Sequence, residues 1–317
     1  MSVARKLPRG EAREPALAVL GAGAPVTGAI EVSVVVPARN AAGMLEECLA
    51  AIVASQPSEV IVVDGLSSDE TIQIARRHGA RVLSDGGRGL PVARMIGAQA
   101  ASSSVVALID ADVVLGAGDL ERLLQERRRG GYAALQAGLR SVSGPGYWGR
   151  ALANHHRTGR SRKWFGVGAT VFVRQILLSH GFDDRFKSGE DIDLRWRLRS
   201  AGVKAGVSRE TVVVHRFGDT WAYAKEQWVA DGRGLARMVR AHGPRAKLLA
   251  VMPLAAGVRG IVLSLIRLEP QWIPYFICFM AYNYSSLIRE LARATPRGKP
   301  GPQTAGVQPD ESHRIAL

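Results

Sequence analysis

Two aspartates one residue apart, Asp110 and Asp112, directly follow the apolar run Val105–Ile109. Two carboxylates in a tight turn at a strand end are suitable ligands for a hard divalent cation, Mg²⁺ or Mn²⁺, with phosphate oxygens completing the coordination. Such a cation neutralises the charge that builds up on a departing diphosphate. A pattern this short also occurs in solvated turns and at helix N-termini, and by itself it favours those structural interpretations.

A second acidic pair, Glu190 and Asp191, follows Ser188 and a glycine. Ser188 is suited to cap a helix whose third position is Asp191. Asp191 and Arg195, and likewise Asp193 and Arg197, are then spaced for ion pairs along that helix. The chemical interpretation makes Asp191 a general base that removes a proton from a hydroxyl group, with Glu190 beside it in the catalytic pair. Alternating apolar residues from 192 to 198 favour a strand instead, but the cap and the glycine at 202 lead us to expect a helix.

These acidic turns need elements that bring them together. Apolar runs alternate with helical stretches along the first half of the chain, with short connections between them. We expect strands over Val32–Val36, Val60–Val63, Arg81–Leu83, Val105–Ile109, Ala169–Val173 and Thr211–Val214, and helices over Ala41–Val53 (with Asn40 as N-cap), over Thr71–His78 and around Gln99. This order predicts an α/β fold with a mostly parallel, doubly wound sheet and helices on both faces.

Ligands of such sheets bind beyond the carboxyl ends of the strands. Three polar turns fall at such ends, so we expect them to line one crevice for a nucleotide-type ligand. The residues that would line it, through backbone or side chain, are Pro37, Ala38, Asn40, Asp64, Asp110 and Ala111.

Four further side chains have two interpretations each. Asp64 could accept a hydrogen bond from a nucleotide base or simply stabilise its turn. Arg88 and Arg94 could clamp phosphates or be exposed cations. His215, at a strand end, could bind the metal or contact the diphosphate, although a lone histidine more often has a structural role.

The chain is strongly basic. Its 317 residues include 42 Lys and Arg against 28 Asp and Glu, a formal net charge of +14, and residues 127–182 contain ten Lys or Arg and no acid. Such a surface attracts phosphates of nucleotides, anionic lipids or nucleic acids. The two distant cysteines, Cys48 and Cys278, argue against a disulfide framework, and the sequence has no zinc-type Cys/His spacing, Walker lysine motif or dinucleotide glycine motif.

Four segments, in this order, resemble family 2 glycosyltransferases of the GT-A fold. VSVVVPARNAAGMLEECLAAI is similar to the family's opening strand, turn and first helix, and VIVVDGLSSDET to its nucleotide-binding turn. GRGLPVARMIGAQAASSSVVALIDADVVL resembles its approach helix and D-x-D motif, and GFDDRFKSGEDIDLRWRLRSAG its acceptor-side helix. The resemblance covers about Val32 to His215, and the order and spacing of the four segments are far more specific than any one of them.

The resemblance implies a metal-dependent transferase with a nucleotide-diphosphate sugar as donor. It implies that Asp64 contacts the base, that Asp112 binds Mg²⁺ or Mn²⁺ with Asp110 on the metal or the ribose, and that Asp191 is the general base. It also implies inversion at the anomeric carbon in a single displacement by an acceptor hydroxyl. The Q-x-x-R-W signature of processive polysaccharide synthases is missing at Gln227, so we expect one sugar to be transferred per encounter.

We expect four regions: a flexible arm over residues 1–28, the catalytic domain over 29–245, a hairpin of two apolar helices over 246–290, and a disordered tail over 291–317. The apolar stretches Leu248–Ile266 and Trp272–Ile288 each approach the ~20 residues needed to cross a bilayer. Basic residues flank both stretches and the connecting turn has one arginine, which predicts a catalytic domain at the cytosolic face of the cytoplasmic membrane. Because Arg259 interrupts the first stretch, helices on the membrane surface and a soluble helical subdomain are the alternatives.

Two other function classes are alternatives. A sugar nucleotidyltransferase has a similar sheet but requires a Gly- and Arg-rich loop with a lysine after the first strand, which PARNAAGM does not provide. A basic nucleic-acid-binding protein would use Arg150–Lys163 together with Tyr147 and Trp148. The four ordered segments and the apolar stretches favour a membrane-associated transferase whose acceptor is a glycolipid or polysaccharide precursor, and they do not favour a nucleic-acid partner.

Overall fold

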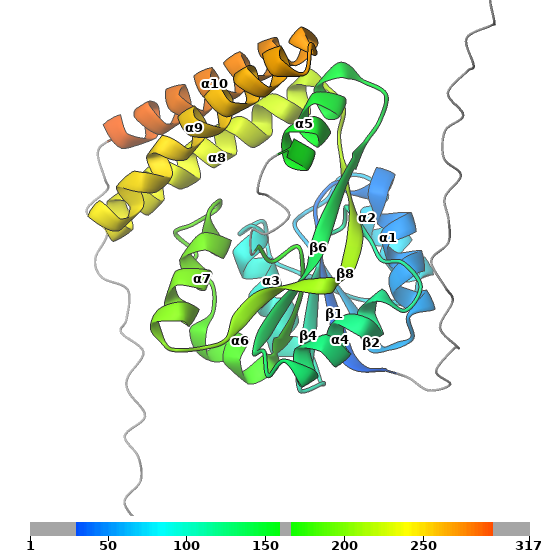
Figure 1. Cartoon of the computed structure of the whole chain (residues 1–317). Helices are drawn as coiled ribbons and strands as arrows, with labels where there is room; N and C mark the ends of the chain where they lie inside the picture. Colours follow the sequence, from blue (N-terminus) through cyan, green and yellow to red (C-terminus); the bar gives the residue numbers. More distant parts are fainter. Residues whose placement is uncertain (1–29, 159–165, 294–317) are drawn as a thin grey trace, which may run out of the picture.

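The computed structural model describes residues 30–158 and 166–293. The expected N-terminal arm (1–28) and nearly all of the expected C-terminal tail (291–317) lie outside the described residues. One mixed sheet forms the body of the described chain, and a layer of long C-terminal helices lies along one side of it (Figure 1).

The sheet has eight strands within the described residues. In spatial order they are β3 (Arg81–Ser84), β2 (Pro57–Asp64), β1 (Ile30–Ala38), β4 (Val105–Ile109), β7 (Ala169–Val173), β6 (Ala134–Ser143), β8 (Ala205–Phe217) and β5 (Val113–Val114). The first four run parallel to one another, as do β6 and β8, whereas β7 is antiparallel to both its neighbours and β5 is antiparallel to β8. The predicted α/β fold with a mostly parallel sheet is confirmed, with an antiparallel strand inserted at its centre.

Helices cover both faces of this sheet. They are α1 (Ala42–Ala54), α2 (Thr71–Arg77), α3 (Leu90–Ala100), α4 (Asp119–Arg129), α5 (Tyr147–Thr158), α6 (Arg174–His180) and α7 (Glu190–Ser200). Alternate residues of β1 point to opposite faces, so that Val34 and Val36 pack in a cluster with α1, α2 and α4, while Val35 packs in another with α3, α6 and α7. The valine run therefore reads as an unbroken apolar strand because both of its faces are buried.

The two predicted helix caps are wrong. Asn40 has a positive φ of 49° and lies before the N-cap position of α1, whose first amides instead donate to Thr71 (2.8 Å) and Asp69 (3.1 Å) from the next turn. At α7 the N-cap is Gly189, with φ 83°, and no side chain caps the helix, so Ser188 does not do so. In both places tertiary contacts replace the local cap that the sequence pattern suggests.

The C-terminal layer contains three long helices. These are α8 (Trp221–His242), α9 (Pro244–Ile266) and α10 (Ile273–Ala292), with the short 3₁₀ turn η2 (Pro270–Trp272) between the last two. The sequence pattern predicts α9 and α10 but not α8. At the α8–α10 crossing, a Cβ on Gly232 would collide with Ser286 Oγ and the Asn283 carbonyl oxygen, so only glycine permits this close approach.

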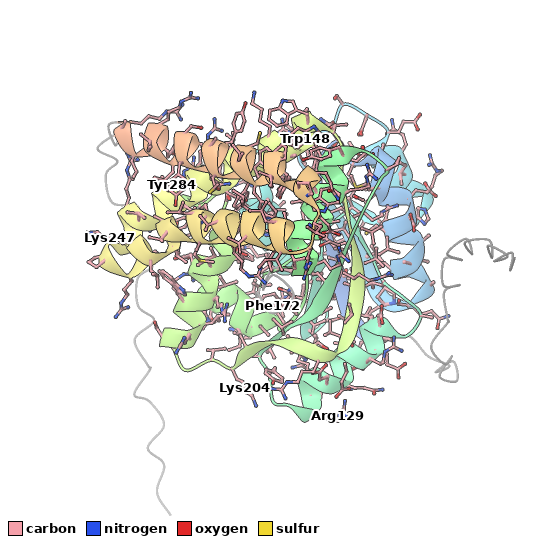
Figure 2. All side chains as sticks on the ribbon, turned by 45° about the horizontal axis from the view of Figure 1, so that its top comes forward. Arg129, Trp148, Phe172, Lys204, Lys247 and Tyr284 are labelled. Atoms are coloured by element: carbon pink, nitrogen blue, oxygen red, sulfur yellow. The ribbon has the colours of Figure 1, made fainter. Side chains whose placement is uncertain are left out.

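Aromatic side chains fill the space between this layer and α5. Trp228 is 1% exposed and packs against Trp148, Trp221 and Tyr275. Figure 2 shows Trp148 at the end of the layer opposite Lys247, which lies near the start of α9. Because Trp148 belongs to this packed cluster, it does not form the open stacking surface that the nucleic-acid alternative requires.

Candidate active site

A buried arginine joins the two acidic segments. Arg94 on α3 is 2% exposed, and its guanidinium donates one hydrogen bond to Glu190 (2.8 Å) and two to Asp110 (2.8 and 3.0 Å). Burial alone would lower the pKa of Arg94, but the charges and hydrogen bonds of Asp110 and Glu190 raise it. The interpretation of Arg94 as an exposed cation is therefore wrong, and both of its terminal nitrogens bind carboxylates.

Asp112 meets His215 because the short strand β5 pairs with β8. Val113 is opposite His215 in this pairing, and His215 Nε2 lies 3.2 Å from Asp112 Oδ2. Burial would lower the pKa of His215, but the hydrogen bond to Asp112 and the charges of Asp112 and Asp110 raise it. The sequence prediction that His215 lies near the D-x-D turn is thus supported by a direct contact.

One carboxylate oxygen of Asp112 has no partner among the described residues, and this bears on whether these residues suit a cation. Asp112 Oδ1 is buried and has no hydrogen-bond partner among the described residues, which is costly for a carboxylate. A divalent cation would satisfy that oxygen. Asp110 is a poorer ligand because both its oxygens accept hydrogen bonds from Arg94. Where the chain is described, no three His, Cys, Asp or Glu residues gather as a complete metal centre. The residues fit a cation that is held jointly with phosphate oxygens.

The turns after β1 and β2 are tied to each other. Ala38 lies opposite Asp64 in the parallel pairing, and the Gly65 amide donates to the Ala38 carbonyl (2.8 Å). Asn40 Oδ1 accepts a hydrogen bond from the Ser68 amide (2.9 Å). Since β1 also pairs with β4, the turns that contain Pro37–Asn40, Asp64 and Asp110–Asp112 all leave the same edge of the sheet, as predicted.

Asp64 stabilises its own turn, which is one of the two options that the sequence left open. It is 3% exposed, and its carboxylate accepts hydrogen bonds from the Ser67 amide (3.1 and 3.3 Å). Arg88 is exposed, and its Nε donates to the Asp85 carbonyl oxygen (2.8 Å). The buried Asp85, which sequence reasoning missed, accepts hydrogen bonds from two loop amides and shapes the segment that carries Arg88.

Asp191 is the second residue of α7, directly after Glu190. Its Oδ1 accepts a hydrogen bond from the Ile192 amide (2.8 Å), and its Oδ2 lies on the side of Gly166. Burial and the neighbouring charge of Glu190 raise the pKa of Asp191 to about 6. A carboxylate with that pKa is largely ionised at neutral pH and is a far better proton acceptor than an ordinary surface aspartate. The predicted ion pair between Asp193 and Arg197 is present, at 2.8 Å.

Asp231 on α8 is an additional carboxylate of this region that sequence reasoning missed. Gly234 and Met238, which are three and seven residues further along the same face of α8, pack against Ser188 and Gly189. Asp231 lies one turn before Gly234 on this face, near enough to Asp191 and Glu190 for their charges to act on it. The Asp231 side chain is exposed to solvent on one side. Desolvation by the protein around it, together with the charges of Asp191 and Glu190, raises its pKa to about 7. The one indication in the sequence is that Asp231 is the single acidic residue in the otherwise basic stretch 228–245.

Known proteins are similar to this chain in sequence or in fold. The family description "Glycosyl transferase family 2" matches residues 33–181. The uncharacterized glycosyltransferase Rv0539 of Mycobacterium tuberculosis is 35% identical over 181 residues, which is 54% of this chain and 80% of that protein. The succinoglycan biosynthesis protein ExoA of Rhizobium meliloti is 27% identical over 245 residues, or 70% of this chain and 74% of ExoA.

Two solved structures have similar folds. The mannosyltransferase PcManGT of Pyrobaculum calidifontis, in complex with GDP-Man and Mn²⁺, has a TM-score of 0.61 at 20% identity and covers 84% of this chain and 88% of its own. Staphylococcus aureus TarS, in complex with UDP-GlcNAc, has a TM-score of 0.52 at 15% identity, with 83% and 89% covered. At these identities the likeness concerns the fold.

The family match includes the turns of Asp64, Asp110 and Asp112, whereas Asp191 and His215 lie beyond it. The identity to Rv0539 extends over four fifths of that protein's length, and the sheet with its flanking helices has the GT-A arrangement. The chain belongs to glycosyl transferase family 2 and is a glycosyltransferase of the GT-A fold.

Proposed function

We propose that the enzyme transfers one sugar from a nucleotide-diphosphate donor to an acceptor hydroxyl, with inversion at the anomeric carbon. The observation that carries this proposal is the Arg94 bridge, because it places the D-x-D turn and the start of α7 on either side of one side chain. A donor bound at Asp112 and an acceptor at Asp191 would then lie next to each other, as a single in-line displacement requires.

Asp112, with His215 beside it, is the part of the chain that would hold Mg²⁺ or Mn²⁺ together with the donor phosphates. When bound, the cation neutralises charge on the leaving diphosphate. The fold relative PcManGT contains GDP-Man and Mn²⁺, which supports a nucleotide sugar and a divalent cation as this enzyme's ligands. Backbone groups of Pro37, Ala38 and Ala111 would line the nucleotide site, with Asn40, Asp64 and Arg88 shaping its edges.

Asp191 is the general base in this proposal. As the acceptor oxygen forms its bond to the anomeric carbon, the bond from that carbon to the diphosphate breaks, and the hydroxyl proton moves to the Asp191 carboxylate. Glu190 is held by Arg94 and acts as a positioning residue, since its negative charge helps to raise the pKa of Asp191. Asp231 adds a second negative charge near Asp191 and would face the acceptor.

The acceptor is proposed to reach the site from a membrane. Among the described helices one, α9, is long and apolar enough to cross a bilayer. Large apolar side chains on α9 are exposed; they are Leu248, Val251, Met252, Leu254, Val258, Val262, Leu265 and Ile266. A core helix of a soluble protein would bury such side chains, so their exposure favours contact with lipid.

The packing of α10 favours helices on the membrane surface over a spanning hairpin. One face of α10 is covered by α8, and Glu290 of α10 pairs with Arg237 of α8 (3.1 Å). The charged helix α8 would have to enter the bilayer together with α10 if the hairpin crossed it. We therefore place α9 in the interface of the cytoplasmic membrane, with the catalytic site on the cytosolic side. The relation to ExoA, a succinoglycan biosynthesis protein, is consistent with a polysaccharide-precursor acceptor.

A panel of UDP-, GDP- and dTDP-sugars with Mn²⁺ or Mg²⁺ tests this function. Release of nucleoside diphosphate that depends on the metal and on acceptor lipid would support it. Asp112→Asn should nearly abolish release while the far-UV circular dichroism spectrum stays unchanged. Release that persists in Asp112→Asn, or in EDTA, would refute the metal assignment.

A further inference from the structure

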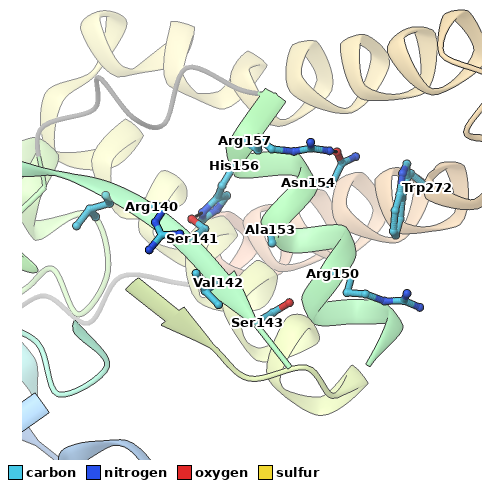
Figure 3. Close-up of a pocket in the computed structure, with 11 residues that line it drawn as sticks. Arg140, Ser141, Val142, Ser143, Arg150, Ala153, Asn154, His156, Arg157 and Trp272 are labelled. Atoms are coloured by element: carbon cyan, nitrogen blue, oxygen red, sulfur yellow. Dashed lines mark hydrogen bonds between the residues drawn. The ribbon is translucent and has the colours of Figure 1, made fainter. Parts of the chain in front are cut away.

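A cavity of about 420 Å³ lies between helix α5 and the second half of β6, apart from the acidic residues of the active site (Figure 3). Three arginines line it: Arg140 on β6, and Arg150 and Arg157 on α5. Trp272 from η2 stands on the other side of α5 from β6 in this view. The cavity thus has basic side chains from two elements and an aromatic ring from a third.

No acid neutralises these arginines within the described residues. The lining contains no Asp or Glu, and the surrounding stretch 127–182 has none either. The side chains of Arg140 and Arg150 have no hydrogen bond or ion pair to any described residue, and the Arg157 guanidinium bonds only to the neutral amide of Asn154 (2.9 Å). Three guanidinium groups around one cavity, with no acid in its lining, create a positive potential that attracts an anion.

The chemistry of the basic groups suits a phosphate or a diphosphate. Arg150 and Arg157 are seven residues apart on one face of α5, which is two turns or about 10 Å of helix. Asn154 lies between them, is 8% exposed, and orients the Arg157 guanidinium. Arginine is the side chain best suited to bidentate recognition of phosphate oxygens.

The position of the cavity indicates where such a phosphate would come from. Trp272 ends the connection between α9 and α10. Ile266, the last residue of α9, and Leu268 in the connection are 72% and 87% exposed. The cavity therefore opens beside the most exposed apolar turn of the C-terminal layer. On its inner side, His156 contacts the Phe217 ring, which in turn contacts His215 of the active site.

We propose that this arginine pocket binds the phosphate or diphosphate group of a lipid at the membrane surface. The inference that the bound lipid is the sugar acceptor rests on the proposed function. The pocket would then hold the acceptor's phosphate while the hydroxyl end reaches the active site past Phe217.

The test compares Arg140→Gln/Arg150→Gln with a control of equal net charge, Arg128→Gln/Arg199→Gln. Arg128 and Arg199 are exposed on α4 and α7 and have no ion pair within the described residues. Binding is measured with full-length protein in EDTA and without nucleotide sugar, so that donor binding does not contribute. One arm uses inorganic pyrophosphate in calorimetry. The other uses sedimentation with phosphatidylcholine vesicles that do or do not contain phosphatidylglycerol.

We expect the pocket variant to lose about tenfold or more in affinity for the anionic vesicles relative to the control variant. If the pocket variant loses affinity only for pyrophosphate, the pocket is an anion site whose ligand is a soluble phosphate compound, and the assignment to a lipid is wrong. Equal behaviour of the two variants in both arms would overturn the proposal. Neither arm requires sugar transfer, so the binding result can be interpreted even if the glycosyltransferase assay fails.

Discussion

Arg94 donates a 2.8 Å hydrogen bond to Glu190 although 96 residues separate them in the sequence. The same guanidinium binds Asp110, so one buried side chain fixes the start of α7 against the D-x-D turn. In the proposed mechanism, the relative placement of donor and acceptor therefore depends on a charge that takes no direct part in the reaction. This relationship leads to the first prediction.

Arg94→Met should destabilise the protein by about 3–5 kcal/mol, because it leaves the buried Glu190 carboxylate without its partner. The control is Arg77→Met, which removes an ion pair to Glu46 whose two side chains are 58% and 55% exposed. It should cost about 0–1 kcal/mol. Urea unfolding of both variants measures the difference, and equal costs would contradict the bridging role.

Asp231→Asn should stabilise the protein at pH 8 more than at pH 5. The folded-state pKa of Asp231, about 7, lies above that of an unfolded aspartate, so the folded state binds more protons in between and stability falls as pH rises through that window. The variant removes this loss. Thermal melts at both pH values test it, with Glu226→Gln on the exposed face of the same helix as control.

The same substitution should leave the acidic limb of the pH–rate profile nearly unchanged. Asp231, with a pKa of about 7, is largely neutral where Asp191, with a pKa of about 6, gains its proton, so removing Asp231 takes away little charge at that point. A limb that moves clearly to lower pH would mean that Asp231 is ionised there and acts on the general base.

Val258→Glu/Val262→Glu should weaken binding to vesicles without unfolding the protein. Both valines lie on the exposed side of α9, at 48% and 47% exposure, and burying such a side chain in lipid contributes roughly 1.5–3 kcal/mol. Sedimentation with vesicles tests this. Val53→Glu/Val212→Glu, on α1 and β8 at 42% and 56% exposure, is the control of equal charge and should bind as the wild type does.

Gly232→Ala should cost about 1–3 kcal/mol, since its methyl group would collide with α10 at Ser286. By contrast, Gly43→Ala on α1 has open space around the new methyl group and should be neutral or stabilising by about 0.5–1 kcal/mol. If both changes had the same effect, the close approach of α8 to α10 would be incorrect.

The sequence predicts the parts of the fold that are set by local patterns. Apolar runs such as Val105–Ile109 are strands because they are buried on both faces, and Asp110 and Asp112 then necessarily leave at the carboxyl edge. Asn40 and Ser188 have the right chemistry for helix caps, but contacts from Asp69 and Thr71, and the left-handed Gly189, decide those helix starts instead.

The remaining features depend on contacts that a linear pattern does not contain. Nothing in the sequence distinguishes Arg94 from an arginine that is exposed on a helix surface. It joins Asp110 to Glu190 only because α7 packs against it. Likewise α8 carries glycines at 232 and 234, which are unfavourable in a helix, because they allow close contact with α10 and with Ser188. Asp231 becomes part of the site only through that contact.

The most direct test of the proposed mechanism is Asp191→Asn, measured for both turnover and donor binding. A general base contributes about 10²–10⁴-fold to the rate, so transfer should fall by that factor while the dissociation constant of the nucleotide sugar, measured by calorimetry, stays within about twofold. The exposed neighbour Asp184→Asn should retain full activity. Transfer that survives in Asp191→Asn, or donor affinity that falls together with transfer, would contradict the assignment of Asp191 as the base.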